Sequence, residues 1–204
     1  MRRFSQQQGQ AVLRGGVFAW LLTTLLVLLF VFDPYAAFAM SPLKLHGAMI
    51  RDGDIGIVGH RGSAAVAPEN TLAAFRIAIE QGVDFVETDV QLTSDAVPVL
   101  MHDPKVDRTT NGGGPLSRYT FAHLRSLDAG SWFSPEFAGE QVPTLEEFTE
   151  LLKPGTTRAF IELKGQWTAE SVSGVIALLR AQGLTMRVVL ASFEPFALDE
   201  YSRV

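Results

Sequence analysis

The pattern of apolar and polar residues along residues 55–204 has two different periodicities. Short, largely apolar runs predict strands at 55–59, 84–91, 97–101, 158–163 and 187–192. Between them lie segments whose apolar residues recur every three or four positions, and these predict helices that end at Gly82, Pro154 and Gly183. Strands that alternate with helices are typical of an α/β fold with parallel strands and crossover helices.

Two stretches depart from this alternation. The connection 93–96 is too short for a helix and predicts a tight turn, stabilised by Asp95, which favours a hairpin between the second and third strands. Residues 103–142 are rich in Gly, Ser, Thr and Pro, and a stretch longer than about 15 residues without regular structure is usually functional. We therefore expect a small packed insertion beside the functional site, followed by a helix that begins with a capping box of Thr144 and Glu147.

The first 39 residues form a separate segment. Residues 15–32 are 18 consecutive residues without a charge, and three arginines precede them. This length is at the lower edge of a membrane-spanning helix, whereas Ala37 and Ala39 also offer a signal-peptidase pattern. Both interpretations predict export, because the arginines stay on the cytoplasmic side. We favour a membrane anchor facing the periplasm or extracellular side over secretion after cleavage at Ala39, and we treat 40–54 as a linker.

Composition restricts the chemistry of the exported part. The formal net charge of -5 and the lack of a basic cluster argue against a nucleic-acid partner. The sequence contains no cysteine, which excludes a disulfide framework, a thiolate metal site and a cysteine nucleophile. Any metal must therefore be held by oxygen or imidazole ligands.

Charged and imidazole side chains gather at or near the carboxyl ends of the predicted strands, where parallel α/β folds place their ligands. They are His60 and Arg61 after the first strand, Glu87 and Asp89 in the second, His102 and Asp103 after the third, and Glu162 and Lys164 at the end of the fourth. Residues two apart in a strand point to the same face, so Glu87 projects with Asp89, and Glu162 with Lys164. Buried carboxylates that converge stay ionised when a cation offsets their repulsion, which predicts Ca²⁺ or Mg²⁺.

The other members of this group suit a phosphodiester substrate. Arg61 and Lys164 offer charge-assisted hydrogen-bond donors to a phosphate. His60 and His102 lie on separate strands and could transfer protons in opposite directions.

Three further features receive no functional role. We expect His46 and His123 to be surface residues. The glycines at 112–114 predict a flexible turn rather than a phosphate-binding loop, because no strand-to-helix junction surrounds them.

The ordered motifs resemble those of the glycerophosphodiester phosphodiesterase family. They read His-Arg-Gly at 60–62, Pro-Glu-Asn-Thr at 68–71, Glu-x-Asp-Val at 87–90, His-Asp at 102–103 and Glu-x-Lys at 162–164. Five motifs in this order are far more specific than any one of them, and the likeness extends over about residues 55–195. Ala96 departs from the family, which often has glycine in that turn.

The resemblance implies a (β/α)₈ barrel that hydrolyses glycerophosphodiesters to sn-glycerol 3-phosphate and an alcohol, by attack of a substrate hydroxyl or of water. It implies metal ligation by Glu87, Asp89 and Glu162. It also implies an acid/base pair of His60 and His102, and phosphate binding by Arg61 and Lys164.

Such a barrel needs about 250 residues, and only five strands can be placed, so we expect residues 55–204 to be a barrel domain truncated after about five strands. Two alternatives stay open. One is a lysophospholipase D-like phosphodiesterase that acts on acylated substrates, and the other is an inactive truncated module that binds phosphate or metal. The oligomeric state is not predicted.

Overall fold

The computed structural model of the protein describes residues 56–194, so the predicted signal or anchor segment (1–39) and linker (40–54) lie outside the described residues. The strands are β1 (Val58–Gly59), β2 (Phe85–Leu92), β3 (Pro98–Leu100), β4 (Arg158–Leu163) and β5 (Val188–Ala191). The helices are α3 (Leu72–Glu80), α4 (Phe121–Leu124), α5 (Leu145–Leu152) and α6 (Ala169–Ala181), with short 3₁₀ turns η1 (Leu116–Arg118) and η2 (Pro135–Phe137). Within residues 56–194, no helix is both long and apolar enough to cross a membrane.

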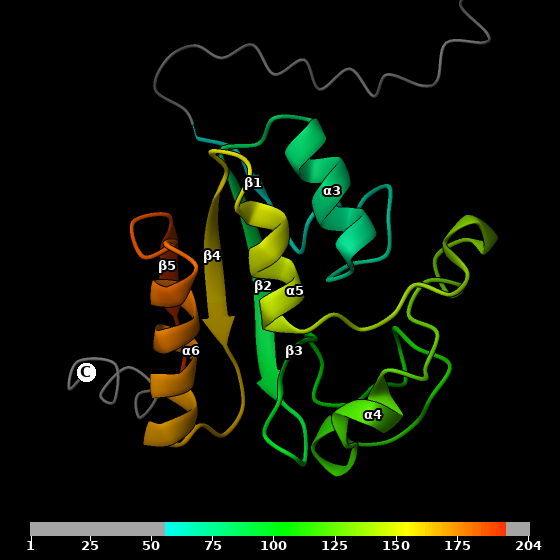
Figure 1. Cartoon of the computed structure of the whole chain (residues 1–204). Helices are drawn as coiled ribbons and strands as arrows, with labels where there is room; N and C mark the ends of the chain where they lie inside the picture. The colour runs from blue at the N-terminus through cyan, green and yellow to red at the C-terminus, as the bar shows by residue number, and fades with distance from the viewer. Residues whose placement is uncertain (1–55, 195–204) are drawn as a thin grey trace, which may run out of the picture. The chain divides into compact units, whose positions relative to one another are not determined.

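The sheet confirms the predicted α/β class. Its order is β1-β2-β4-β5, and each neighbouring pair along this path is parallel. Helices α3, α5 and α6 lie on one side of the sheet (Figure 1). An edge-to-face contact between Phe75 of α3 and Phe148 of α5, with ring centroids 4.6 Å apart, joins two of these helices over the sheet.

The two faces of β2 and β4 differ in chemistry because alternate residues of a strand point to opposite faces. The face toward the helices is apolar apart from one threonine and is at most 2% exposed, and it consists of Val86, Thr88, Val90, Ala159, Ile161 and Leu163. The opposite face carries the stacked rings of Phe85 and Phe160, with centroids 4.8 Å apart. Further toward the carboxyl ends, the same face carries the acidic residues of these two strands.

Strand β3 runs antiparallel to β2, as the short connection 93–96 predicts. Asp95 accepts hydrogen bonds from the Thr93 hydroxyl and from the backbone N–H of Phe121, so it stabilises the turn and also anchors the start of α4. Ala96 has a φ of +61°, a conformation that glycine adopts without a steric penalty.

This reversal corrects the expected route by which His102 reaches the other polar residues. The chain folds back along β2 until the Met101 N–H donates to the carbonyl of Asp89 at 3.0 Å. His102 therefore arrives at the level of Asp89 at the end of a hairpin, not at the carboxyl end of a parallel strand. The physical reason is length, because a parallel crossover needs about a dozen residues and only a tight turn is available.

The stretch 103–142 packs around an apolar cluster that also includes residues in and directly after β3. The cluster consists of Val99, Met101, Val106, Leu116, Leu124, Ala129 and Val142, all at most 4% exposed. At the end of this stretch Thr144 and Glu147 form the predicted capping box that begins α5. Arg125 donates two hydrogen bonds of 2.7 Å to the carboxylate of Glu147 and so ties the insertion to that helix.

The loop between β1 and α3 packs closely against α3 at Gly62. This glycine has a φ of +82°, and a Cβ added to it would lie 2.7 Å from the backbone carbonyl carbon of Ala74 on α3. Real Cβ atoms do not approach backbone so closely, so Gly62 fixes how near the loop lies to the helix.

We expect Gly62→Ala to lower the free energy of unfolding by about 1–3 kcal/mol more than Gly114→Ala, because only the first change overpacks the structure. Gly114 is the matched control, since its φ is +98° but an added Cβ would meet no atom within 4 Å. Urea denaturation of both variants measures the difference. Equal losses would show that φ alone, and not contact with α3, makes glycine necessary at position 62.

Candidate active site

Three acidic side chains converge on the open face of the sheet. Glu87 and Asp89 come from β2 and Glu162 from β4, where Asp89 and Glu162 are direct partners in the parallel register. Each offers a carboxylate oxygen, and these oxygens lie within 4.8 Å of one another. Asp89 is 1% exposed, and the two glutamates are partly buried. The predicted convergence of the three carboxylates is confirmed.

The electrostatics of this trio favour an additional cation. Burial and the neighbouring charge of Asp89 raise the pKa of Glu87 above its usual value, although the Arg61 backbone N–H, which donates to Oε2 at 2.9 Å, acts in the opposite direction. A set of oxygen ligands with unbalanced negative charge suits a hard divalent ion such as Ca²⁺ or Mg²⁺. The trio could therefore hold such a metal.

The two predicted phosphate-binding cations lie beside the trio. Lys164 Nζ is 3.1 Å from Asp89 Oδ1 and 3.8 Å from Glu162 Oε1. Arg61 Nη1 donates to Glu69 Oε1 at 2.9 Å. The Nε of Arg61 is buried, makes no hydrogen bond and lies 3.5 Å from Asp89 Oδ2. Arg61 is thus held between Glu69 and Asp89, with its guanidinium charge beside the carboxylate trio.

The two predicted histidines occupy different surroundings. The His60 side chain is 68% exposed, and its Nε2 lies 3.7 Å from Glu87 Oε2. His102 is less exposed, and its Nδ1 lies 2.7 Å from Asp103 Oδ1. His60 lies beside Glu87 of the carboxylate trio. His102 instead contacts Asp103, which accepts hydrogen bonds from Arg108.

Asn70, for which the sequence indicated no role, is a central support of the site. Asn70 Nδ2 donates to Asp89 Oδ2 at 3.0 Å, and its Oδ1 accepts from the Thr88 hydroxyl at 2.9 Å. Its φ of +55° is tolerated better by asparagine than by most other residues. From the sequence, the Pro-Glu-Asn-Thr motif at 68–71 was used only as part of the family signature.

Gln91 is a second support that was missed. Its side chain is buried, and Nε2 lies 2.7, 3.1 and 2.9 Å from the carbonyl oxygens of Met101, His102 and Asp103. Gln91 therefore holds the backbone that presents His102. The signal was available, because Gln91 follows Glu87 and Asp89 at the same spacing of two residues.

The features that were expected to be non-functional can be placed as well. His123 is exposed and stacks on Tyr119 with ring centroids 4.6 Å apart, which confirms its surface position. The glycine turn is held by hydrogen bonds, since Gly114 N–H donates to Asp107 Oδ2 at 2.8 Å and Gly113 N–H to the Tyr119 hydroxyl at 3.2 Å. His46 lies outside the described residues.

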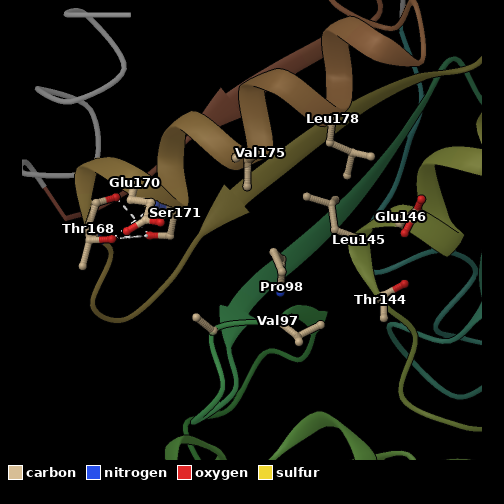
Figure 2. A pocket seen from close by; sticks show the side chains of 12 residues that line it. Val97, Pro98, Thr144, Leu145, Glu146, Thr168, Glu170, Ser171, Val175 and Leu178 are labelled. Carbon is tan, nitrogen blue, oxygen red and sulfur yellow. Dashed lines mark hydrogen bonds between the residues drawn. The ribbon is translucent and has the colours of Figure 1, made fainter.

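A separate groove of about 510 Å³ lies between α5, α6 and the β2–β3 hairpin (Figure 2). Its apolar lining includes Val97, Pro98, Leu145, Val175 and Leu178. Thr168 and Ser171 at its edge bond to each other in the capping box of α6. None of the predicted site residues lines this groove, so it is distinct from the carboxylate site.

We expect Glu87→Gln to stabilise the metal-free protein at neutral pH. A carboxyl group whose pKa is raised by folding binds more protons in the folded state, so its ionisation costs stability as pH rises. Removing that charge should therefore raise the thermal midpoint at neutral pH. The same change should abolish any rise in the midpoint on adding Ca²⁺ or Mg²⁺, and differential scanning fluorimetry with and without each ion tests both effects. A variant that is less stable and still responds to the ions would contradict this account of Glu87.

The sequence is similar to those of known proteins. Residues 60–200 match the model of the glycerophosphoryl diester phosphodiesterase family. A glycerophosphodiester phosphodiesterase of Caldanaerobacter subterraneus subsp. tengcongensis is 38% identical over 150 residues, which are 72% of this chain and 62% of that protein. Glycerophosphodiester phosphodiesterase 1 of Homo sapiens is 43% identical over 161 residues, 76% of this chain and 46% of that protein.

Solved structures show the same likeness. An Oleispira antarctica phosphodiesterase, in complex with the product sn-glycerol-3-phosphate, superposes with a TM-score of 0.70 at 35% identity, covering 74% of this chain and 62% of that one. A glycerophosphodiester phosphodiesterase of Agrobacterium tumefaciens gives a TM-score of 0.67 at 37% identity, covering 72% and 62%. The chain thus spans less than two thirds of the length of these relatives. The matched residues include every motif that forms the site, and the chain belongs to the glycerophosphoryl diester phosphodiesterase family.

Proposed function

We propose that this protein hydrolyses glycerophosphodiesters to sn-glycerol 3-phosphate and an alcohol with the help of a divalent metal ion. The observation that carries the proposal is the carboxylate trio, with two cations and a histidine in contact with it on one open face of the sheet. We further propose that this face is the interior of a (β/α)₈ barrel, as in the family. The product bound to the Oleispira antarctica relative supports the choice of substrate class.

Glu87, Asp89 and Glu162 would hold one Ca²⁺ or Mg²⁺. Three carboxylates within 4.8 Å fit either ion, because both accept carboxylate oxygens and leave positions for water or substrate. Such an ion would supply positive charge against the phosphate and polarise its oxygen.

Arg61 and Lys164 would bind the non-bridging phosphate oxygens. Arg61 donates to Glu69 and lies beside Asp89, so its positive charge is held at the edge of the carboxylate trio, where a phosphate would meet it. Lys164 Nζ is already drawn to Asp89 and Glu162, which places its charge at the edge of the metal site.

His60 and His102 would transfer the protons. One would take the proton of the attacking hydroxyl, which belongs to the substrate or to water, and the other would protonate the leaving alcohol. Their different positions suit opposite roles, because His60 is mostly exposed beside Glu87 while His102 is held by Asp103.

We also propose that the protein acts outside the cytoplasm, held to the membrane by residues 15–32. The support is the uncharged run of 18 residues behind three arginines. The glycerophosphodiesters available there would be small soluble molecules that reach the site from the aqueous side.

We expect the full chain to release glycerol 3-phosphate from glycerophosphocholine when Ca²⁺ or Mg²⁺ is present. His60→Ala and His102→Ala should each lower kcat/KM by about 100-fold or more, because each removes a proton-transfer group. His123→Ala is the control, since this histidine is exposed and stacks on Tyr119 away from the network.

A coupled enzymatic assay for glycerol 3-phosphate measures these rates. Absence of product, or equal activity in the wild type and His60→Ala, would refute the proposed function. Faster turnover of an acylated substrate such as lysophosphatidylcholine would favour the lysophospholipase D-like alternative.

A further inference from the structure

Arg108 occupies an unusual position for a residue of the insertion. Its Nε and Nη2 donate to the two oxygens of Asp103 at 2.7 and 3.1 Å. Its Nη1 and Nη2 donate to the two oxygens of Glu69 at 2.8 Å each. Arg108 therefore joins two carboxylates from separate segments of the chain, one in the β1–α3 loop and one beside His102.

These contacts distinguish Arg108 from a phosphate ligand. A guanidinium has five N–H groups, and four hydrogen bonds to Glu69 and Asp103 already form two bidentate pairs. Arg61, in contrast, has a buried Nε without a hydrogen-bond partner. Although 43% of the Arg108 side chain is exposed, its donors are directed at protein carboxylates and not at the open face.

Each of these two carboxylates also contacts a residue to which the proposed function assigns a role. Asp103 Oδ1 lies 2.7 Å from His102 Nδ1. Glu69 Oε1 accepts from Arg61 Nη1 at 2.9 Å. A continuous path of hydrogen bonds thus runs from His102 through Asp103, Arg108 and Glu69 to Arg61, which ties the orientation of a proton-transfer group to that of a phosphate-binding group.

The contact with Asp103 also determines where His102 carries its proton. The hydrogen bonds from Arg108 hold the pKa of Asp103 well below its usual range, and the bond with His102 acts in the same direction. An aspartate of ordinary pKa is already ionised at neutral pH, so the part of Arg108 is to fix where the two oxygens of Asp103 lie relative to His102. An ionised carboxylate can only accept hydrogen bonds, so Nδ1 of a neutral His102 must be the protonated nitrogen. Its Nε2 is then the nitrogen with a free lone pair.

We propose that Arg108 is a positioning residue, which clamps Asp103 and Glu69 and thereby fixes the ring orientation and the tautomer of His102. This inference rests on the proposed function and assigns to the insertion a part in catalysis, although Arg108 itself touches no reacting atom. Gln91 complements it by holding the backbone carbonyls of Met101, His102 and Asp103 from the sheet side.

The kinetic test compares Arg108→Ala with Arg125→Ala in the full chain. Arg125 is a matched control, because it also forms a bidentate pair with a carboxylate, that of Glu147, and contacts none of the site residues. Arg108→Ala should lower kcat by about 10- to 100-fold with little change in KM, the size of effect expected when a catalytic group is misaligned. Arg108→Lys should recover only part of the loss, since a single ammonium cannot form two forks. Arg125→Ala should leave kcat within about twofold of the wild type.

A second measurement observes His102 without any substrate. The protein is labelled with ¹⁵N-histidine and studied by NMR in detergent micelles at alkaline pH, and the resonances are assigned with His102→Ala. In the wild type and in Arg125→Ala the ¹⁵N shifts should show a His102 ring protonated at Nδ1. In Arg108→Ala they should move toward a mixture of the two tautomers.

The two measurements separate this inference from the proposed function. A wild-type chain that releases no glycerol 3-phosphate would refute the proposed function, while the NMR comparison would still decide whether Arg108 controls His102. Unchanged His102 resonances in Arg108→Ala would overturn the inference. Equal losses of kcat in Arg108→Ala and Arg125→Ala would overturn it as well, because both would then reflect general loosening of the insertion.

Discussion

The site depends on one constraint, which is that the charge of Asp89 is almost completely removed from water. Its side chain is 2% exposed, and an unpaired buried carboxylate would cost several kcal/mol. Lys164 and Asn70 offset this cost by contact, and Arg61 lies close by. These partners come from the end of β4 and from the β1–α3 loop, so satisfying one carboxylate brings together segments that are distant in sequence.

Strand β2 links this polar arrangement to the stability of the domain. Its residues alternate between Val86, Thr88 and Val90, which pack under the helices, and Glu87 and Asp89, which face the open side. The same backbone therefore supports the apolar layer and the site. Because Glu87 and Asp89 alternate along one strand with buried apolar residues, the packing under the helices also fixes the positions of the two carboxylates.

The sequence predicted what depends on local periodicity. The spacing of Glu87 and Asp89 determined their shared face, and Thr144 with Glu147 determined where α5 begins. The direction of β3 also followed from the length of one turn. The resemblance to a family supplied the set of interacting motifs, and the structure shows most of them in contact.

Interactions between distant segments could not be predicted in this way. Arg108 meets Glu69 across 39 positions, and nothing in the periodicity of either segment indicates the pairing. Asn70 reaches Asp89 from a backbone with a positive φ. Asparagine tolerates this conformation, but an asparagine in the sequence does not by itself predict it. These residues act through backbone geometry and long-range contacts, which a linear pattern does not contain.

The short hairpin has a consequence for how related chains can vary in length. Because strand side chains alternate with a period of two, one residue added to or removed from the 93–96 turn can shift the pairing of β3 against β2 and turn its side chains to the other face. Residues beyond Arg108 take no part in the path from His102 to Arg61, and their buried side chains pack into the apolar cluster of the insertion instead. The region from Glu87 to Arg108 should therefore behave as a fixed-length unit during evolution.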